Sequence, residues 1–197
     1  MAKLYFRYGA MGCGKTMQLL QVAFNYEERG HKVCVIKPAM DTKNGDWLLT
    51  RIGPERQTDF TFAKDDNLFD KVKEGFSDVA CVLVDEAQFI TPAQADQLSE
   101  IVIRLGIPVM AYGLRLNFRQ SDGGFEGATR LLQIAQDIEE IKTICECGSK
   151  ATRQARFLDD ELVTTGPDIL IDDGSTKIEY RALCPACFLD YLENSAN

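Results

Sequence analysis

The sequence has little of what a membrane protein or a nucleic-acid-binding protein needs. No apolar run approaches the roughly 18 residues that a membrane span requires, and the start shows no long apolar region typical of a signal peptide. Basic residues are also few, since 22 Lys and Arg stand against 30 Asp and Glu, for a net charge of −8. Such a charge repels a phosphate backbone and disfavours a nucleic-acid polymer as partner. We expect a cytoplasmic protein.

Histidine is nearly absent as well, because His31 is the only one in the chain. It follows Gly30, a residue type that ends helices, and we interpret His31 as a solvated loop residue. Acid–base chemistry in this protein is therefore expected to depend on carboxylates.

Short apolar runs alternate with segments of helical periodicity. The runs predict buried strands at residues 4–8, 32–37, 80–85, 108–113 and 140–145. Helices are predicted at residues 16–29, 67–75, 92–105 with Thr91 as N-cap, and 127–136. This alternation predicts an α/β fold with a parallel sheet flanked by helices. Residues 38–62 have no clean period, and we expect a functional or mobile loop with a short helix there.

The segment between the first predicted strand and helix matches the phosphate-loop pattern G-x-x-x-x-G-K-[ST]. It comprises Gly9, Ala10, Met11, Gly12, Cys13, Gly14, Lys15 and Thr16. Glycines let backbone N–H groups converge on phosphate oxygens, Lys15 reaches the β- and γ-phosphates, and Thr16 can bind Mg²⁺. A chance match is disfavoured because the strand-loop-helix context is also present. The pattern predicts a P-loop NTPase sheet of the RecA-like kind that binds a nucleoside triphosphate.

The apolar run "CVLVDEAQF" supplies the second half of a phosphoryl-transfer site. A buried strand that ends in Asp85 brings a carboxylate to the Mg²⁺ held at the loop. Glu86 follows directly, and with no suitably placed histidine it is the better candidate for a general base. Ala87 and Gln88 complete the predicted nucleotide-binding turn. The alternative is an acidic pair that is only solvated.

Four of the seven cysteines come in two close pairs, Cys145 with Cys147 and Cys184 with Cys187. Two tight turns that supply four thiolates suit a tetrahedral, structural Zn²⁺ with no open position. The alternative, buried cysteines without metal, is disfavoured because the segment is too small to form its own core. The sequence thus predicts a P-loop ATP-binding domain at 1–144 and a zinc-binding module at 145–197. The chain between the pairs contains Ile169, Ile171 and Tyr180, which could line a pocket for a flat ring.

Together these motifs resemble the type II thymidine kinases, the family that includes the human cytosolic enzyme and its bacterial relatives. The resemblance rests on "GAMGCGKT", "VLVDEAQF", "YGLRLNFR", "FEG", "IEEIKTICECGSKAT" and "YRALC", in the family's order and spacing. It implies transfer of the ATP γ-phosphoryl group to the 5′-hydroxyl of thymidine, with Mg²⁺ and a structural Zn²⁺. It also implies a homotetramer and feedback inhibition by thymidine triphosphate.

The resemblance assigns roles to further residues. Glu86 matches the catalytic base and Asp85 the Mg²⁺ partner. The thymidine pocket is implied to involve the aromatic residues Phe89, Phe118, Phe125 and Tyr180, together with a lasso loop that includes Ile169, Leu170, Ile171, Asp172 and Asp173. Taken singly, each phenylalanine is more often core than pocket.

Two departures from the family pattern bear on the site. Where the family usually has Asp-x-Arg, this chain has Asp41-Thr-Lys43, so the phosphate contact would be a point charge, and Arg51 is a candidate to share that task. The lasso lacks the usual Gly-Gly pair and is about two residues longer. Two other functions remain open from the residues themselves: an NTPase that hydrolyses ATP or GTP with Glu86 orienting water, and a zinc-ribbon nucleic-acid module joined to an ATP site.

Overall fold

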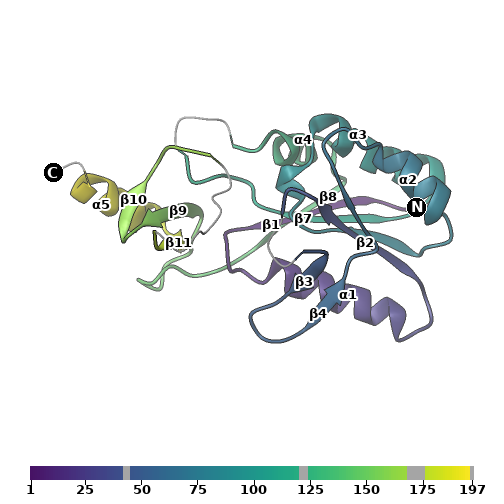
Figure 1. Ribbon diagram of the computed structural model, residues 1–197, viewed down its shortest axis with the longest axis horizontal. Helices are drawn as coiled ribbons and strands as arrows, with labels where there is room; N and C mark the ends of the chain where they lie inside the picture. Colours follow the sequence, from purple (N-terminus) through teal and green to yellow (C-terminus); the bar gives the residue numbers. More distant parts are fainter. Residues whose placement is uncertain (42–44, 120–123, 168–175, 196–197) are drawn as a thin grey trace.

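The main body of the protein is a parallel sheet of six strands in the order β5-β2-β6-β7-β1-β8 (Figure 1). The computed structural model describes residues 1–41, 45–119, 124–167 and 176–195. The strands are β1 (Leu4–Gly9), β2 (Val33–Pro38), β5 (Phe60–Phe62), β6 (Cys81–Val84), β7 (Val109–Gly113) and β8 (Asp137–Ile141). The predicted parallel α/β sheet is confirmed. Because all the strands run parallel, their carboxyl ends share one edge of the sheet.

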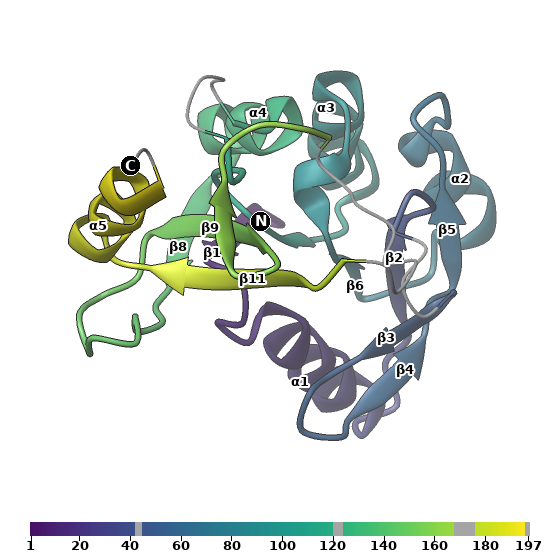
Figure 2. The same ribbon diagram turned by 60° about the vertical axis from the view of Figure 1, so that its left-hand side comes forward.

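Helices cover both faces of this sheet (Figure 2). On one face, α1 (Lys15–Glu27) packs Leu19, Leu20 and Ala23 against the strands. The other face is covered by α2 (Leu68–Gly75), α3 (Pro92–Glu100) and α4 (Glu126–Ile134). With apolar cores on both sides, the central strands are buried on both faces, as their continuous apolar sequences predict. No helix among the described residues has the length and apolar character of a membrane span.

The helix and strand limits differ from the predictions in two instructive places. Thr91 is the N-cap of α3 with a complete capping box, as predicted, but the helix changes at Ile101 to a π-helical turn that ends at Leu105. The last strand of the sheet is β8 at Asp137–Ile141, which begins three residues before the strand predicted at 140–145. Its register pairs Tyr5 with Asp137, and Arg7 holds Asp137 in a salt bridge of 2.6 Å.

The segment at 38–62 contains strands, and the expected short helix is wrong for its described residues. A hairpin forms from β3 (Trp47–Leu49) and β4 (Glu55–Gln57), and β5 then joins the main sheet. The hairpin is anchored to the main body by Leu48. This side chain is buried in the apolar core on the side of the sheet that α1 covers, while its neighbours Trp47 and Leu49 are exposed. This alternation is that of a strand with one buried face.

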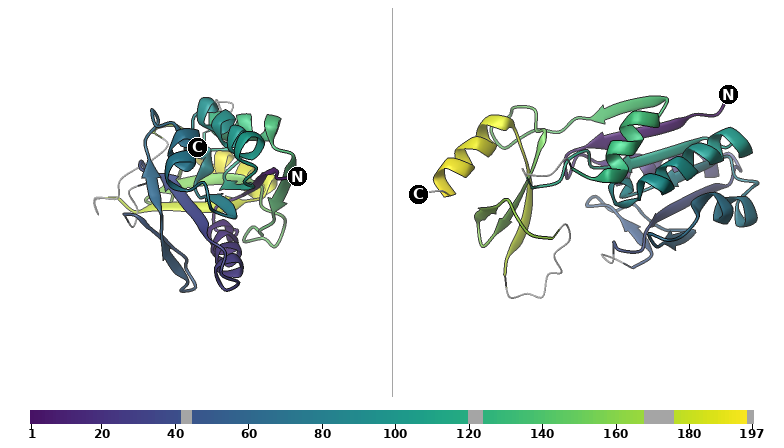
Figure 3. Two further views of the ribbon diagram at one scale, coloured as in Figure 1. Left: turned by 90° about the vertical axis from the view of Figure 1, so that its right-hand side faces the viewer. Right: turned by 90° about the horizontal axis from the view of Figure 1, so that it is seen from above.

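A small module follows the main sheet and lies at the opposite end of the molecule from the N-terminus (Figure 3). It consists of the antiparallel strands β10 (Glu161–Val163), β9 (Arg153–Leu158) and β11 (Ile178–Leu183), followed by α5 (Pro185–Ser195). The sequence patterns did not predict α5. The module has a small apolar core of its own, which groups Ala155, Phe157 and Phe188 with Cys145 and Cys184, so the expectation that this segment is too small for a core is wrong.

Candidate functional site

The phosphate loop leaves β1 at the carboxyl edge of the sheet and leads into α1. Gly12 and Gly14 have φ angles of 72° and 88°, which glycine adopts at no steric cost. Lys15 is 8% exposed, and its Nζ donates to the carbonyl oxygens of Ala10 at 3.0 Å and Gly9 at 3.4 Å. The loop therefore presents a glycine-rich turn, a buried ammonium group and a helix N-terminus at one point, which together suit a polyphosphate.

Asp85 follows β6 and reaches the start of α1. Thr16 Oγ1 donates to Asp85 Oδ2 at 3.0 Å, while Asp85 Oδ1 is buried without a hydrogen-bond partner in the part of the chain described. Burial, reinforced by the nearby Glu86 charge, raises the pKa of Asp85 to about 7. A buried carboxylate oxygen without a partner, beside a threonine hydroxyl, provides two oxygen ligands of the kind that Mg²⁺ prefers.

Glu86 adopts a backbone conformation that is rare outside glycine. Its φ of 49° and ψ of 37° are left-handed, and the short 3₁₀ turn Ala87–Phe89 begins directly after it. Such a conformation costs on the order of 1–3 kcal/mol, and it persists where the surroundings over-determine it, often in active sites. Gln88 Nε2 donates to Glu86 Oε2, and the amide is fixed because Leu114 N–H donates to Gln88 Oε1 at 2.9 Å. The carboxylate is thus held in one orientation.

A cavity of about 730 Å³ opens beside this turn. Two of the predicted pocket residues, Phe89 and Phe125, line it and meet edge to face with ring centroids 5.5 Å apart. Gln88 and Thr91 also line it. The cavity has the size and the aromatic wall of a small-molecule pocket.

The other two predicted aromatic residues lie nearer the module. Phe118 is 4% exposed, and the Arg156 guanidinium stacks over its ring at 3.5 Å from the centroid. Tyr180 on β11 is the cross-strand partner of Arg156 on β9, so the two side chains share one face of the module sheet. Sequence reasoning missed Arg156, which has no motif around it.

The candidate phosphate contacts near residue 41 are only partly described. Asp41 forms a salt bridge of 3.1 Å with Lys37, and the Lys37 side chain has no exposed surface. Arg51 Nη1 lies 3.7 Å from where a Cβ on Gly12 would stand, which brings this guanidinium to the phosphate loop. Lys43, Ile169, Leu170, Ile171, Asp172 and Asp173 lie outside the described residues.

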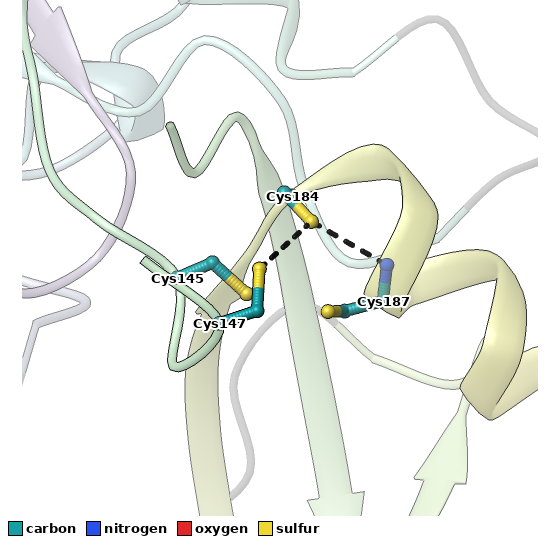
Figure 4. Close-up of side chains that lie close together, drawn as sticks. All are labelled: Cys145, Cys147, Cys184 and Cys187. Carbon is teal, nitrogen blue, oxygen red and sulfur yellow. Dashed lines mark hydrogen bonds between the residues drawn. The ribbon is translucent and has the colours of Figure 1, made fainter. Parts of the chain in front are cut away.

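The four paired cysteines converge, although 36 residues separate the pairs (Figure 4). Their sulfur atoms all lie within 4.8 Å of one another, and Cys147 Sγ is 3.6 Å from Cys184 Sγ. Four thiolates at about 2.3 Å from a tetrahedral Zn²⁺ would be about 3.8 Å apart, so the cluster fits the ion. Hydrogen bonds from Ser149 lower the pKa of Cys147 to about 6, which favours the thiolate that binds metals.

The sequence as a whole matches a known family. The thymidine kinase family model covers residues 2–188. The chain belongs to the thymidine kinase family.

Individual members of the thymidine kinase family are similar over nearly the full length. The thymidine kinase of Chromobacterium violaceum is 45% identical over 95% of this chain and 98% of its own. Those of Francisella tularensis subsp. holarctica and Lactiplantibacillus plantarum are each 44% identical, over 93% and 87% of this chain and 95% and 88% of their own. A solved DNA replication initiation factor is similar at a TM-score of 0.41 and 15% identity, over 71% of this chain and 40% of its own.

Proposed function

We propose that this chain transfers the γ-phosphoryl group of ATP to the 5′-hydroxyl of thymidine. The observation that carries this proposal is the meeting of Thr16, Asp85 and Glu86 at the carboxyl edge of the sheet, beside an aromatic-walled cavity. A hydrolase would need the first three groups and a place for the base of its nucleotide, but no second pocket for the ring of an acceptor. Membership of the thymidine kinase family favours the nucleoside as acceptor over water.

The triphosphate is assigned to the phosphate loop. Lys15 would turn from the carbonyl oxygens of Gly9 and Ala10 to the β- and γ-phosphate oxygens, because their charge attracts the ammonium group more strongly than neutral carbonyls do. Arg51 beside Gly12 would add a second cation. Asp85 and Thr16 would hold Mg²⁺, whose chemistry in such sites is to neutralise charge on the phosphoryl oxygens.

Glu86 is assigned as the general base. Its carboxylate would accept the 5′-hydroxyl proton while the 5′-oxygen bonds to the γ-phosphorus and ADP leaves with the bridging oxygen. The orientation of the carboxylate matters because proton transfer requires a donor–acceptor separation of roughly 2.6–3.2 Å. The Gln88 amide, itself fixed by Leu114 N–H, supplies that orientation.

The nucleoside is assigned to the aromatic side of the site. Phe89 and Phe125 would contact the flat base in the cavity, and Phe118 and Tyr180 would complete the pocket from the module side. The module at 145–197 would be held by one structural Zn²⁺ on the four cysteines. A homotetramer, a cytoplasmic location and feedback inhibition by thymidine triphosphate complete the proposal.

The experiment measures both products. Purified protein is incubated with ATP and each of the four deoxynucleosides, with and without Mg²⁺, and ADP and the nucleoside monophosphate are quantified together. We expect equimolar ADP and thymidine monophosphate, only with Mg²⁺, and much less turnover of the purine deoxynucleosides. ADP formed at the same rate without a nucleoside would identify a hydrolase and overturn the proposal.

A further inference from the structure

One face of β9 is turned away from the module's own core and carries buried polar side chains. Ala155 and Phe157 pack into that core, whereas Gln154 and Arg156 lie on the opposite face and are 5% and 1% exposed. Buried polar groups are costly unless they are hydrogen-bonded. The partners of these two side chains therefore show what this face of β9 does.

Gln154 reaches the phosphate loop. The backbone N–H of Met11 donates to Gln154 Oε1 at 3.0 Å, across 143 residues of sequence. Within the loop, Cys13 N–H donates to the Ala10 carbonyl oxygen at 3.3 Å. The first half of the loop is thus held by one internal turn and by one amide from the metal-binding module.

Arg156 acts on a different part of the site. Its guanidinium stacks on Phe118 and donates to the carbonyl oxygens of Pro167 at 2.6 Å and Thr165 at 2.7 Å. Tyr180 is its cross-strand neighbour. Phe118 and Tyr180 are on the side assigned to the nucleoside, and none of the partners named here belongs to the phosphate loop.

We infer that Gln154 is a positioning residue for the phosphate loop, and that β9 connects the module to the two substrates separately. Gln154 orders the loop that takes the ATP phosphates, while Arg156 orders the nucleoside side. A loop already held in its binding conformation loses less entropy when the ligand binds, so each contact strengthens binding of its own substrate. The inference rests on the proposed function, which assigns ATP to the loop and thymidine to the pocket beside Phe118.

The first test is Gln154→Met, which keeps the side-chain length but removes the hydrogen-bond acceptor. We expect the Kd for ATP, measured by calorimetry without thymidine, to rise by about 3- to 10-fold, as for loss of one neutral hydrogen bond. The thymidine KM and the zinc content should stay unchanged. Hydrogen exchange of the Met11 amide should become faster. Arg153→Met is the matched control, because Arg153 is an exposed residue on the same strand.

The second test is Arg156→Met, which should raise the thymidine KM and leave the Kd for ATP unchanged. If that variant does not fold, Arg156→Lys keeps the charge but loses the planar stack, and the same split is expected. The inference is overturned if Gln154→Met leaves the Kd for ATP and Met11 exchange unchanged, or if it weakens both substrates equally. A parent protein that binds ATP in a Gln154-dependent way but phosphorylates no nucleoside would refute the proposed function and leave the role of Gln154 standing.

Discussion

Gly127, at the start of α4, is the position where one added methyl group should disturb the pocket most. A Cβ at this position would stand 2.2 Å from the carbonyl oxygen of Ile90 and 2.9 Å from its carbonyl carbon. Normal contact begins near 3.5 Å, so the backbone would have to separate by about 1 Å. Because the obstacle is backbone, no side-chain rotation can relieve it.

The expected magnitude for Gly127→Ala follows from two opposing effects. Overpacking of this kind costs about 1–3 kcal/mol, and the backbone contact favours the upper end. Alanine in a helix recovers about 1 kcal/mol relative to glycine. We therefore expect a net loss of about 2 kcal/mol in the free energy of unfolding, and a Tm lower by about 4–8 °C for a chain of this size. Urea denaturation with a fitted midpoint and slope measures it.

The same variant should also weaken the nucleoside pocket. Phe125 is the N-cap of α4, so displacement of the helix start moves its ring relative to Phe89. The thymidine KM should rise while the KM for ATP stays unchanged. Gly75→Ala is the matched control, because no heavy atom lies within 4 Å of a Cβ there, and we expect it to be neutral or stabilising by up to about 1 kcal/mol. A Gly127→Ala protein as stable as the parent would refute the packing argument.

Three further predictions concern the site and the module. Glu86→Gln keeps size and hydrogen bonding but removes the base, so steady-state kcat should fall about 10²–10⁴-fold with both substrates still bound; a parental rate would remove the assignment. Zinc should be present at about one per chain by elemental analysis, and its chelation should unfold the module in far-UV circular dichroism, whereas a fully active zinc-free protein would contradict this. The pKa of Asp85 is raised to about 7 from 3.8, so its favourable contribution to stability below about pH 4 is lost as pH rises through 7. Metal-free Asp85→Asn should therefore gain stability relative to the parent from pH 4 to 8 in urea titrations, and a constant difference would count against the shift.

The central sheet could be predicted from the sequence because its strands are buried on both faces. The residues of β2 and β6 are all buried, and a run of adjacent apolar residues is the direct consequence. The phosphate loop could be predicted equally well, since its motif is local and each residue type in it has a known role in phosphate binding. Convergence of the cysteines followed from the chemistry of Zn²⁺, which requires four ligands at one point.

What the sequence could not predict is short or depends on distant contacts. β3 and β4 have three residues each, too few to establish a period, and only Leu48 of β3 is buried. The pattern does not reveal α5, because Cys184 directly precedes it and Cys187 is in its first turn, and a close cysteine pair indicates a metal-binding turn. The contact between Gln154 and Met11 joins residues 143 apart, and a glutamine in a strand carries no sign of its partner.

The strand order poses one geometric problem that Gly113 resolves. Asp85 follows β6 and the phosphate loop follows β1, but β7 lies between these two strands. Neighbouring strands are about 4.8 Å apart, so the end of β6 is about 10 Å from the end of β1. The turn after β6 must therefore pass over the end of β7 to bring Asp85 within 3.0 Å of Thr16.

Gly113 is the last residue of β7 and stands under that turn. A Cβ on it would lie 2.9 Å from both the backbone nitrogen and the Oε1 of Gln88. Any side chain there would lift the turn that carries Glu86 and break the bond from Leu114 N–H to the Gln88 amide. Gly113→Ala should accordingly lower kcat, and the loss expressed as an activation free energy should exceed the loss in the free energy of unfolding. The reason is that the turn moves outward into the site while the sheet beneath it stays packed. Thermal melting and steady-state kinetics on the same preparation measure both, and an unchanged kcat would show that the turn does not depend on this close approach.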